Sequence, residues 1–303
     1  MSSLQLQATK DMANPERRGL KKGLYLVPSA FTAANILMGF FAVMFALRAF
    51  QLIGIGGTAN LKNAADYCDW AAKFIGWAVL FDMLDGRIAR MTKTTTEIGV
   101  QLDSIADVIT FGLAPTVLAF VWGFGSALAE GSDLYKVGLF ISFMYLMCGA
   151  FRLARFNVQS SRPRILAEGT IKMDKKSFVG LPIPVAGCLV AAIVHFAPTP
   201  LIGYGFERAE LYSILLIVLI GFLSVMMVST MRFSSFKTVG TRSRSMRTII
   251  LAVGIGVLIF LFSRYVLLAV VLGYILLGFF SRLTALFRRR PDLSESKVHA
   301  KET

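Results

Sequence analysis

Eight long apolar runs constrain what this sequence can fold into more than any other feature. A helix that crosses a bilayer needs roughly 20 predominantly apolar residues, and each run is close to that length. The runs lie at 25–50, 66–89, 100–125, 136–154, 179–197, 211–231, 247–262 and 264–282. The mean hydropathy of +0.65 over 303 residues is also too high for an ordinary soluble domain. The sequence therefore predicts an all-α, polytopic membrane protein with about eight transmembrane helices.

The basic residues alternate from loop to loop, and this pattern predicts the topology. Lys and Arg gather in both termini and in the second, fourth and sixth loops, whereas the odd loops carry one each. By the positive-inside rule, both termini and the even loops are then cytoplasmic, against anionic lipid headgroups. The net charge of +14 is explained in this way, so we expect membrane lipids and no nucleic acid as partners. In a bacterium, the location would be the inner membrane.

Four aspartates interrupt this apolar pattern in the stretch FDMLDGRIARMTKTTTEIGVQLDSIADVITF, residues 81–111. A carboxylate inside a transmembrane segment is costly and marks a functional site by default. The loop between the second and third runs is short, so the two helices form an antiparallel hairpin. At 100° per residue, Asp82 and Asp85 share one face of the helix at 66–89, and Asp103 and Asp107 share one face of the helix at 100–125. All four carboxylates can therefore point into a common space near the cytoplasmic surface.

Three explanations of these carboxylates can be compared on the sequence. Ion pairing with Arg87 and Arg90 has poor spacing, since neither lies three or four residues from Asp82 or Asp85. A cation or proton pathway, as in a transporter, remains an alternative. Divalent cations such as Mg²⁺ or Mn²⁺ bind carboxylate oxygens, and four carboxylates match two cations that share ligands. Two such cations suit phosphoryl chemistry, so a lipid phosphate at the headgroup level becomes the expected substrate.

The same residues resemble a known family. The pattern Asp82-x-x-Asp85-Gly86-x-x-Ala89-Arg90, eight residues, then Gly99-x-x-x-Asp103-x-x-x-Asp107 matches the complete signature of the CDP-alcohol phosphatidyltransferase family. The resemblance implies that the four aspartates bind two metal ions, Mg²⁺ or Mn²⁺. It also implies that Asp107 is the catalytic base for the acceptor hydroxyl. The CDP-lipid site would be formed by Gly86, Ala89, Arg90 and Gly99. On the sequence alone, the glycines could equally pack helices closely, and Arg90 could be a membrane-edge anchor.

Further segments narrow the expected acceptor alcohol. DSIADVITFGLAP, CGAFRLARFNV, FVGLPIPVAG and VSTMRFSSFK occur in the order found in the integral-membrane CDP-diacylglycerol–serine O-phosphatidyltransferases of this family. The resemblance implies transfer of a phosphatidyl group to L-serine, which gives phosphatidylserine and CMP. Arg152, Arg155 and Asn157 lie at the cytoplasmic end of the fourth run, where an arginine could bind the serine carboxylate. Choline, a glycerol phosphate or an inositol phosphate remain alternative acceptors.

The resemblance also divides the chain. It implies a six-helix core at 25–240, preceded by a basic cytoplasmic or interfacial segment at 1–24. An additional pair of transmembrane helices follows at 241–287, and a basic disordered tail at 288–303. Members of the family form homodimers, so we expect one here. The three cysteines show no paired spacing and are expected to be free, and His195 stands alone and is expected to be structural.

Overall fold

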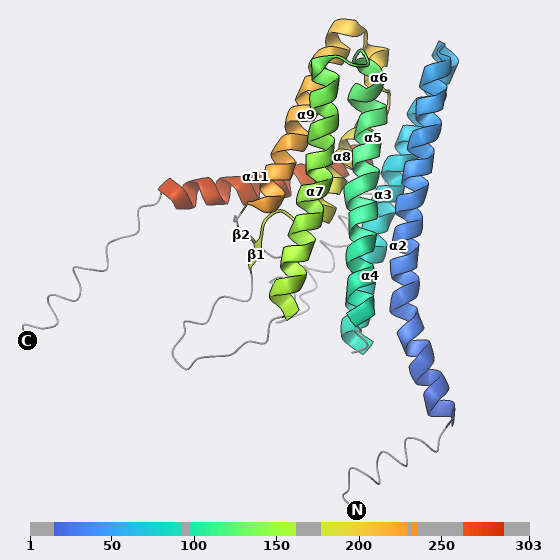
Figure 1. Ribbon diagram of the computed structural model, residues 1–303, viewed down its shortest axis with the longest axis vertical. Helices are drawn as coiled ribbons and strands as arrows, with labels where there is room; N and C mark the ends of the chain where they lie inside the picture. Colours follow the sequence, from blue (N-terminus) through green and yellow to red (C-terminus); the bar gives the residue numbers. More distant parts are fainter. Residues whose placement is uncertain (1–14, 93–96, 162–176, 230–231, 235–262, 288–303) are drawn as a thin grey trace, which may run out of the picture.

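The computed structural model describes residues 15–92, 97–161, 177–229, 232–234 and 263–287, and it is a helix bundle (Figure 1). The α-helices are α2 (Pro15–Ile55), α3 (Thr58–Thr92), α4 (Glu97–Asp107), α5 (Ala114–Ala119), α6 (Gly125–Ala127), α7 (Asp133–Ser161), α8 (Ile183–Phe196), α9 (Phe206–Val228) and α11 (Ser263–Phe287). The other elements are the π-helical turns η1 (Val108–Leu113) and η2 (Phe120–Phe124), the 3-10 turn η3 (Leu201–Tyr204), and strands β1 (Ser177–Val179) and β2 (Arg232–Ser234).

The bundle has the lengths and composition of a multi-pass membrane protein. Among the described residues, four helices are long and apolar enough to cross a membrane: Ala30–Ile55, Ile98–Ala127, Asp133–Val158 and Phe206–Val228. Ile183–Phe196 and Ser263–Phe279 are shorter apolar helices. The predicted second span lies in α3, which does not reach the same hydropathy because it carries charged residues, two of the four aspartates among them.

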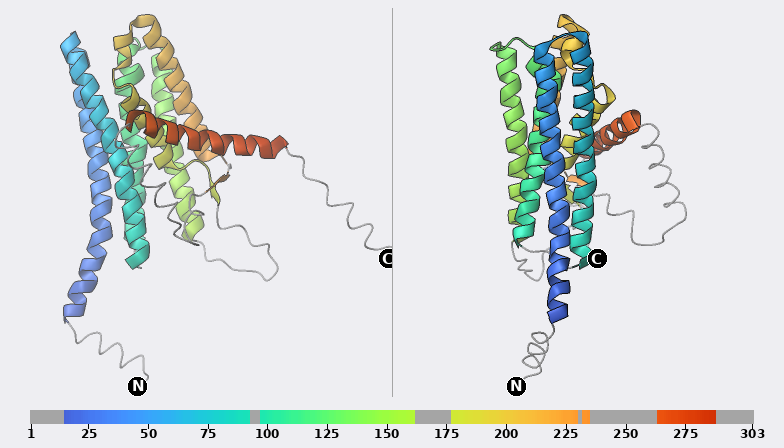
Figure 2. Two further views of the ribbon diagram at one scale, coloured as in Figure 1. Left: turned by 180° about the vertical axis from the view of Figure 1, so that it is seen from behind. Right: turned by 90° about the vertical axis from the view of Figure 1, so that its right-hand side faces the viewer.

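Helices α2 and α3 form a long antiparallel hairpin (Figure 2). Small residues line the buried side of both, including Ala42, Ala46 and Ala49 on α2. Small side chains let membrane helices approach closely, which suits a pair packed over most of its length. Helix α2 begins at Pro15, so residues 15–24 of the predicted N-terminal segment continue into the first membrane run.

The third predicted span is a single interrupted helix from α4 to α6. Two π-helical turns, η1 and η2, break its regular hydrogen bonding. Helix α2 packs against η1 at Gly39, where a Cβ atom would lie 2.5 Å from the Thr110 Oγ1. Only glycine permits this approach. It brings the buried face of α2 against η1, the turn that follows Asp107. Such π-helical turns occur frequently at functional sites.

Two short strands add to the predicted all-helical fold. Strands β1 and β2 pair antiparallel, with Phe178 opposite Phe233. Gly180 follows β1 with φ +83°, and a Cβ there would lie 2.3 Å from the Met227 carbonyl oxygen. The close approach of two backbones lets the Leu181 N–H donate to the Met226 carbonyl at 3.0 Å. Backbone hydrogen bonds thus join the segment before α8 to the end of α9 and to β2, although the hydropathy pattern indicates only the ends of two spans there.

Helix α11 lies across the bundle instead of along it (Figures 1 and 2). It matches the second member of the predicted C-terminal pair, and the first member, 247–262, lies outside the described residues. Ile275 of α11 is buried, and two ring contacts dock the helix onto the core: the rings of Phe279 and Phe222 are 5.9 Å apart, and those of Tyr265 and Phe196 are 5.5 Å apart. Helix α11 therefore packs on α8 and touches α9 through the Phe222–Phe279 ring contact.

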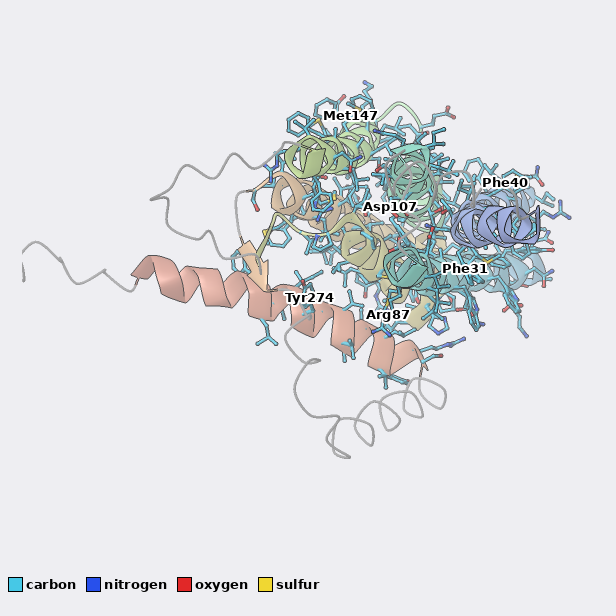
Figure 3. The ribbon with its side chains drawn as sticks, turned by 90° about the horizontal axis from the view of Figure 1, so that it is seen from below. Phe31, Phe40, Arg87, Asp107, Met147 and Tyr274 are labelled. Carbon is cyan, nitrogen blue, oxygen red and sulfur yellow. The ribbon has the colours of Figure 1, made fainter. Side chains whose placement is uncertain are left out.

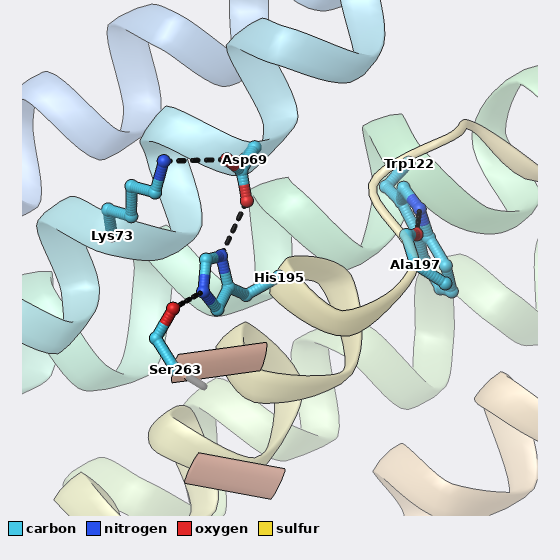
Figure 4. Close-up of polar contacts among 6 residues, drawn as sticks. All are labelled: Asp69, Lys73, Trp122, His195, Ala197 and Ser263. Atoms are coloured by element: carbon cyan, nitrogen blue, oxygen red, sulfur yellow. Dashed lines mark hydrogen bonds and ion pairs between the residues drawn. The ribbon is translucent and has the colours of Figure 1, made fainter. Parts of the chain in front are cut away.

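A polar network joins α3, α8 and α11 around the buried side chains of Asp69 and His195 (Figure 4). His195 Nδ1 lies 2.5 Å from the Asp69 carboxylate, and its Nε2 lies 2.9 Å from the Ser263 hydroxyl. The Lys73 ammonium lies 2.7 Å from the other Asp69 oxygen. Both ring nitrogens of His195 have partners, which fits the structural role expected for it. The three cysteines are free, as expected.

Candidate active site

Three of the four aspartates form a compact group of carboxylates. Asp82 comes from α3, and Asp103 and Asp107 come from α4, and one ligand atom from each lies within 4.8 Å of the others. Asp107 is the last residue of α4 and is buried, whereas Asp82 and Asp103 are half-buried. Seen along the bundle, Asp107 lies among the helices, while Phe40 and Met147 lie on the outside (Figure 3). Helices α3 and α4 thus bring Asp82 and Asp107, which are 25 positions apart in the sequence, into one interior site.

Asp85, the fourth predicted metal ligand, stands slightly apart from this group. Its side chain is buried, and its Oδ2 accepts a hydrogen bond from the Thr32 hydroxyl of α2. Its charge still acts on Asp82, Asp103 and Asp107. The hydrogen bond therefore ties α2 to the edge of the carboxylate group.

Ion pairing does not explain these carboxylates in the described part of the chain. The ion pairs there join Lys73 and His195 to Asp69, and Lys136 to Asp133, so none involves the four aspartates. Arg87 is exposed. Like-charged carboxylates this close repel one another unless positive charge lies between them. Arg152 is one positive charge that acts on Asp107, and the remaining repulsion must be offset by a bound cation or by proton uptake.

The donor set fits a hard divalent cation. All available ligand atoms are carboxylate oxygens, which Mg²⁺, Mn²⁺ and Ca²⁺ prefer. The Oδ1 atom of Asp107 is buried and has no hydrogen-bond partner, so this oxygen has an unmet need for positive charge or a donor. Asp82, Asp103 and Asp107 could hold such a cation, and Asp85 lies one helical turn from Asp82 on α3.

The residues predicted for the CDP-lipid site belong to the end of α3 and the beginning of α4, where the two helices are connected. Gly86 is exposed one residue after Asp85, and Gly99 is half-buried one turn before Asp103. Ala89 and Arg90 belong to the last turns of α3, but their side chains lie outside the described part of the chain. The backbone thus places all four on the same side of the carboxylate group, toward the loop at 93–96.

The predicted acceptor residues on α7 differ from one another. Arg152 is 8% exposed, its charge acts on Asp107, and its Nε has no hydrogen-bond partner. Arg155 is half-buried, one turn further along. The amide of Asn157 donates to the Ser104 hydroxyl at 2.8 Å, so Asn157 ties α7 to α4 beside Asp103. Arg152 therefore acts electrostatically on the carboxylate group from α7.

The sequence reasoning missed polar residues on two other helices. Thr32 and Asn35 of α2 are buried at the level of the aspartates, and with Gly39 they form a stripe at helical spacing within an apolar run. This stripe of polar and small residues is the sequence feature from which their position beside the site could have been predicted. Tyr274 of α11 interacts electrostatically with Arg152, and nothing in the sequence indicates this contact, because it depends on how α11 crosses the bundle.

Comparisons with known proteins agree with this geometry. A sequence model of the family described as CDP-alcohol phosphatidyltransferase matches residues 25–218, which is more than half of the chain. The chain is 33% identical over 218 residues to a CDP-diacylglycerol–serine O-phosphatidyltransferase of Helicobacter pylori, covering 71% of this chain and 75% of that protein. It is 29% identical over 205 residues to the protein of that name from Methanocaldococcus jannaschii, covering 68% and 72%. For the one from Bacillus subtilis the identity is 33% over 171 residues, covering 55% and 76%.

Proposed function

The chain belongs to the CDP-alcohol phosphatidyltransferase family, and on that premise we propose that it transfers the phosphatidyl group of CDP-diacylglycerol to L-serine. The products are phosphatidylserine and CMP. The observation that carries the proposal is the carboxylate group of Asp82, Asp103 and Asp107, whose ligand atoms lie within 4.8 Å of one another. Such a group at the matched segment suits phosphoryl transfer on a divalent cation.

The proposed roles of the aspartates are those that the family signature implies. Asp82, Asp85 and Asp103 would hold the cations, and Asp107 would serve both as a metal ligand and as the base that accepts the proton of the serine hydroxyl. When bound, two cations, Mg²⁺ or Mn²⁺, neutralise the carboxylates and stabilise charge on the diphosphate and on the departing CMP. Asp107 suits the base role because it is buried, and a desolvated carboxylate holds a proton more readily than an exposed one.

The bond changes are balanced in a single displacement. The serine oxygen attacks the phosphorus that bears the diacylglycerol, and its proton passes to Asp107. The bond from that phosphorus to the bridging oxygen breaks, and CMP leaves with the bridging oxygen. Gly86, Ala89, Arg90 and Gly99 would line the CDP end of the donor.

Serine as the acceptor is supported by two observations. The relatives above are named for serine, and Arg152 is a buried cation beside Asp107. A free serine carries a carboxylate, and the planar guanidinium of an arginine can bind it through two hydrogen bonds. Arg155 lies one turn closer to the loop and would assist in attracting the substrate.

The membrane arrangement completes the proposal. Both termini and the carboxylate site face the cytoplasm, because the basic loops lie at that side. CDP-diacylglycerol then enters from the bilayer, and serine enters from the cytoplasm. The additional C-terminal helix pair and the homodimer stay predictions from the sequence and the family.

The test is acceptor-dependent release of CMP from the purified, full-length protein in detergent. CDP-diacylglycerol and Mn²⁺ or Mg²⁺ are supplied, and serine, choline, glycerol-3-phosphate and inositol phosphate are offered separately. We expect CMP release with serine, and its loss with EDTA. Release with a different alcohol would keep the family chemistry and refute serine. Ion flux in liposomes without any CMP release would favour the transporter alternative.

A further inference from the structure

Asn35 of α2 has a buried side-chain amide without hydrogen-bond partners in the described part of the protein. It is 1% exposed, and neither its Oδ1 nor its Nδ2 has a hydrogen-bond partner. Buried polar side chains in native proteins are overwhelmingly paired, and the exceptions usually serve a bound ion, a water or a catalytic group. A residue with this character on α2 therefore indicates a partner that the isolated fold does not supply.

The turn of α2 that carries Asn35 is held against the carboxylate group from two sides. Thr32, three residues earlier, donates to Asp85 of α3. Thr110, three residues beyond Asp107, donates to the Asn35 carbonyl at 3.1 Å. Since α2 and α3 are antiparallel, moving three residues forward from Thr32 corresponds to moving three back from Asp85, to the level of Asp82. Helical side chains also lean toward the N-terminus of their own helix, so the amide leans toward the aspartates.

One oxygen atom in the carboxylate group is a hydrogen-bond acceptor that lacks a donor. Asp107 Oδ1 is buried and lacks a donor. An ionised carboxylate only accepts hydrogen bonds, and an amide nitrogen donates two. An amide also adds no charge, which matters because four carboxylates already balance two divalent cations. A lysine or arginine at position 35 would compete with those cations, whereas asparagine does not.

We propose that Asn35 is a positioning residue of the metal centre. Its Nδ2 and Asp107 Oδ1 each lack a partner in the structure, and the hydrogen bond between them would form when the other oxygen of Asp107 binds a divalent cation. This inference rests on the proposed function, because it assumes that the carboxylate group binds metal. Residues that orient metal ligands in this way commonly account for a tenfold to hundredfold difference in metal affinity. Asn35 belongs to α2, outside the hairpin that carries the aspartates.

The test is Mn²⁺ binding by the full-length protein in detergent with CDP present, measured by the electron paramagnetic resonance signal of free Mn²⁺. Asn35→Leu keeps a similar volume without polar atoms, and Asn35→Ala removes most of the side chain. We expect both to weaken Mn²⁺ binding about tenfold or more. Without metal, Asn35→Leu should melt at or above the wild-type temperature, because it removes an unpaired buried amide. Ser224→Ala is the matched control, since Ser224 is buried in α9 and donates only to Ile220 of its own helix.

The outcomes separate the inference from the proposed function. If Asp82→Ala binds Mn²⁺ like the wild type, or if neither binds it, the metal centre itself is refuted. If the wild type binds, Asp82→Ala does not, and both Asn35 variants bind normally, only the role of Asn35 is refuted. A lower melting temperature with unchanged Mn²⁺ affinity, or failure of both Asn35 variants to fold, would assign Asn35 to packing and overturn the inference.

Discussion

Replacing Arg152 with alanine should selectively impair the use of serine. Arg152 is 8% exposed, acts electrostatically on Asp107 and has a free Nε, so it can bind a carboxylate away from water. Exposed ion pairs contribute about 0–1 kcal/mol, but a desolvated hydrogen bond to a charged group contributes about 1.5–3 kcal/mol. At 1.36 kcal/mol per factor of ten, Arg152→Ala should raise the serine KM by roughly 10- to 150-fold.

The assay is CMP release with serine and CDP-diacylglycerol varied independently. The KM for CDP-diacylglycerol should change much less than the KM for serine. Arg152→Lys keeps the charge but loses the two-pronged geometry, so it should fall between the wild type and Arg152→Ala. Ser142→Ala is the matched control on the same helix, because Ser142 is buried without a side-chain partner and lies ten residues away from Arg152.

Two results would refute this reasoning. Equal increases in both KM values would show that Arg152 binds phosphate or supports the site as a whole. An unchanged serine KM would remove Arg152 from acceptor binding and leave Arg155 as the remaining candidate on α7. In either case the carboxylate group would keep its proposed role.

Three further predictions concern other parts of the structure. Asp107→Asn should fold and still bind CDP-diacylglycerol, but CMP release should fall about 10²- to 10⁴-fold, as expected when a general base is lost; substantial residual activity would exclude that role. Gly39→Ala should lower the free energy of unfolding by about 1–3 kcal/mol, because its Cβ would lie 2.5 Å from Thr110 Oγ1; an unchanged melting curve would show that α2 can move without cost. His195→Ala should destabilise the fold by about 1–3 kcal/mol in thermal unfolding without changing the serine KM, since Asp69 keeps its lysine partner but loses the imidazole; a shift in KM would connect this network to the site.

The sequence was informative wherever a local pattern determined the geometry. Helical spacing and a short connecting loop bring Asp82, Asp103 and Asp107 together, because helical spacing determines which face carries the carboxylates and a short loop keeps the two helix ends close. The family signature and the length of the apolar runs likewise identified the family and the multi-pass character of the chain. The free cysteines followed from the lack of paired spacing.

Contacts between segments distant in the sequence required the tertiary structure. Hydropathy treats the run at 264–282 like any other span, and only its packing on α8 and its ring contact with α9 lay α11 across the bundle and bring Tyr274 near Arg152. Thr32 and Asn35 are likewise two polar residues in an apolar run until α2 packs on α3 and η1. Periodicity within one helix determines which residues share a face. Which neighbour that face meets depends on close packing of the whole bundle, and that information lies in no single stretch of the chain.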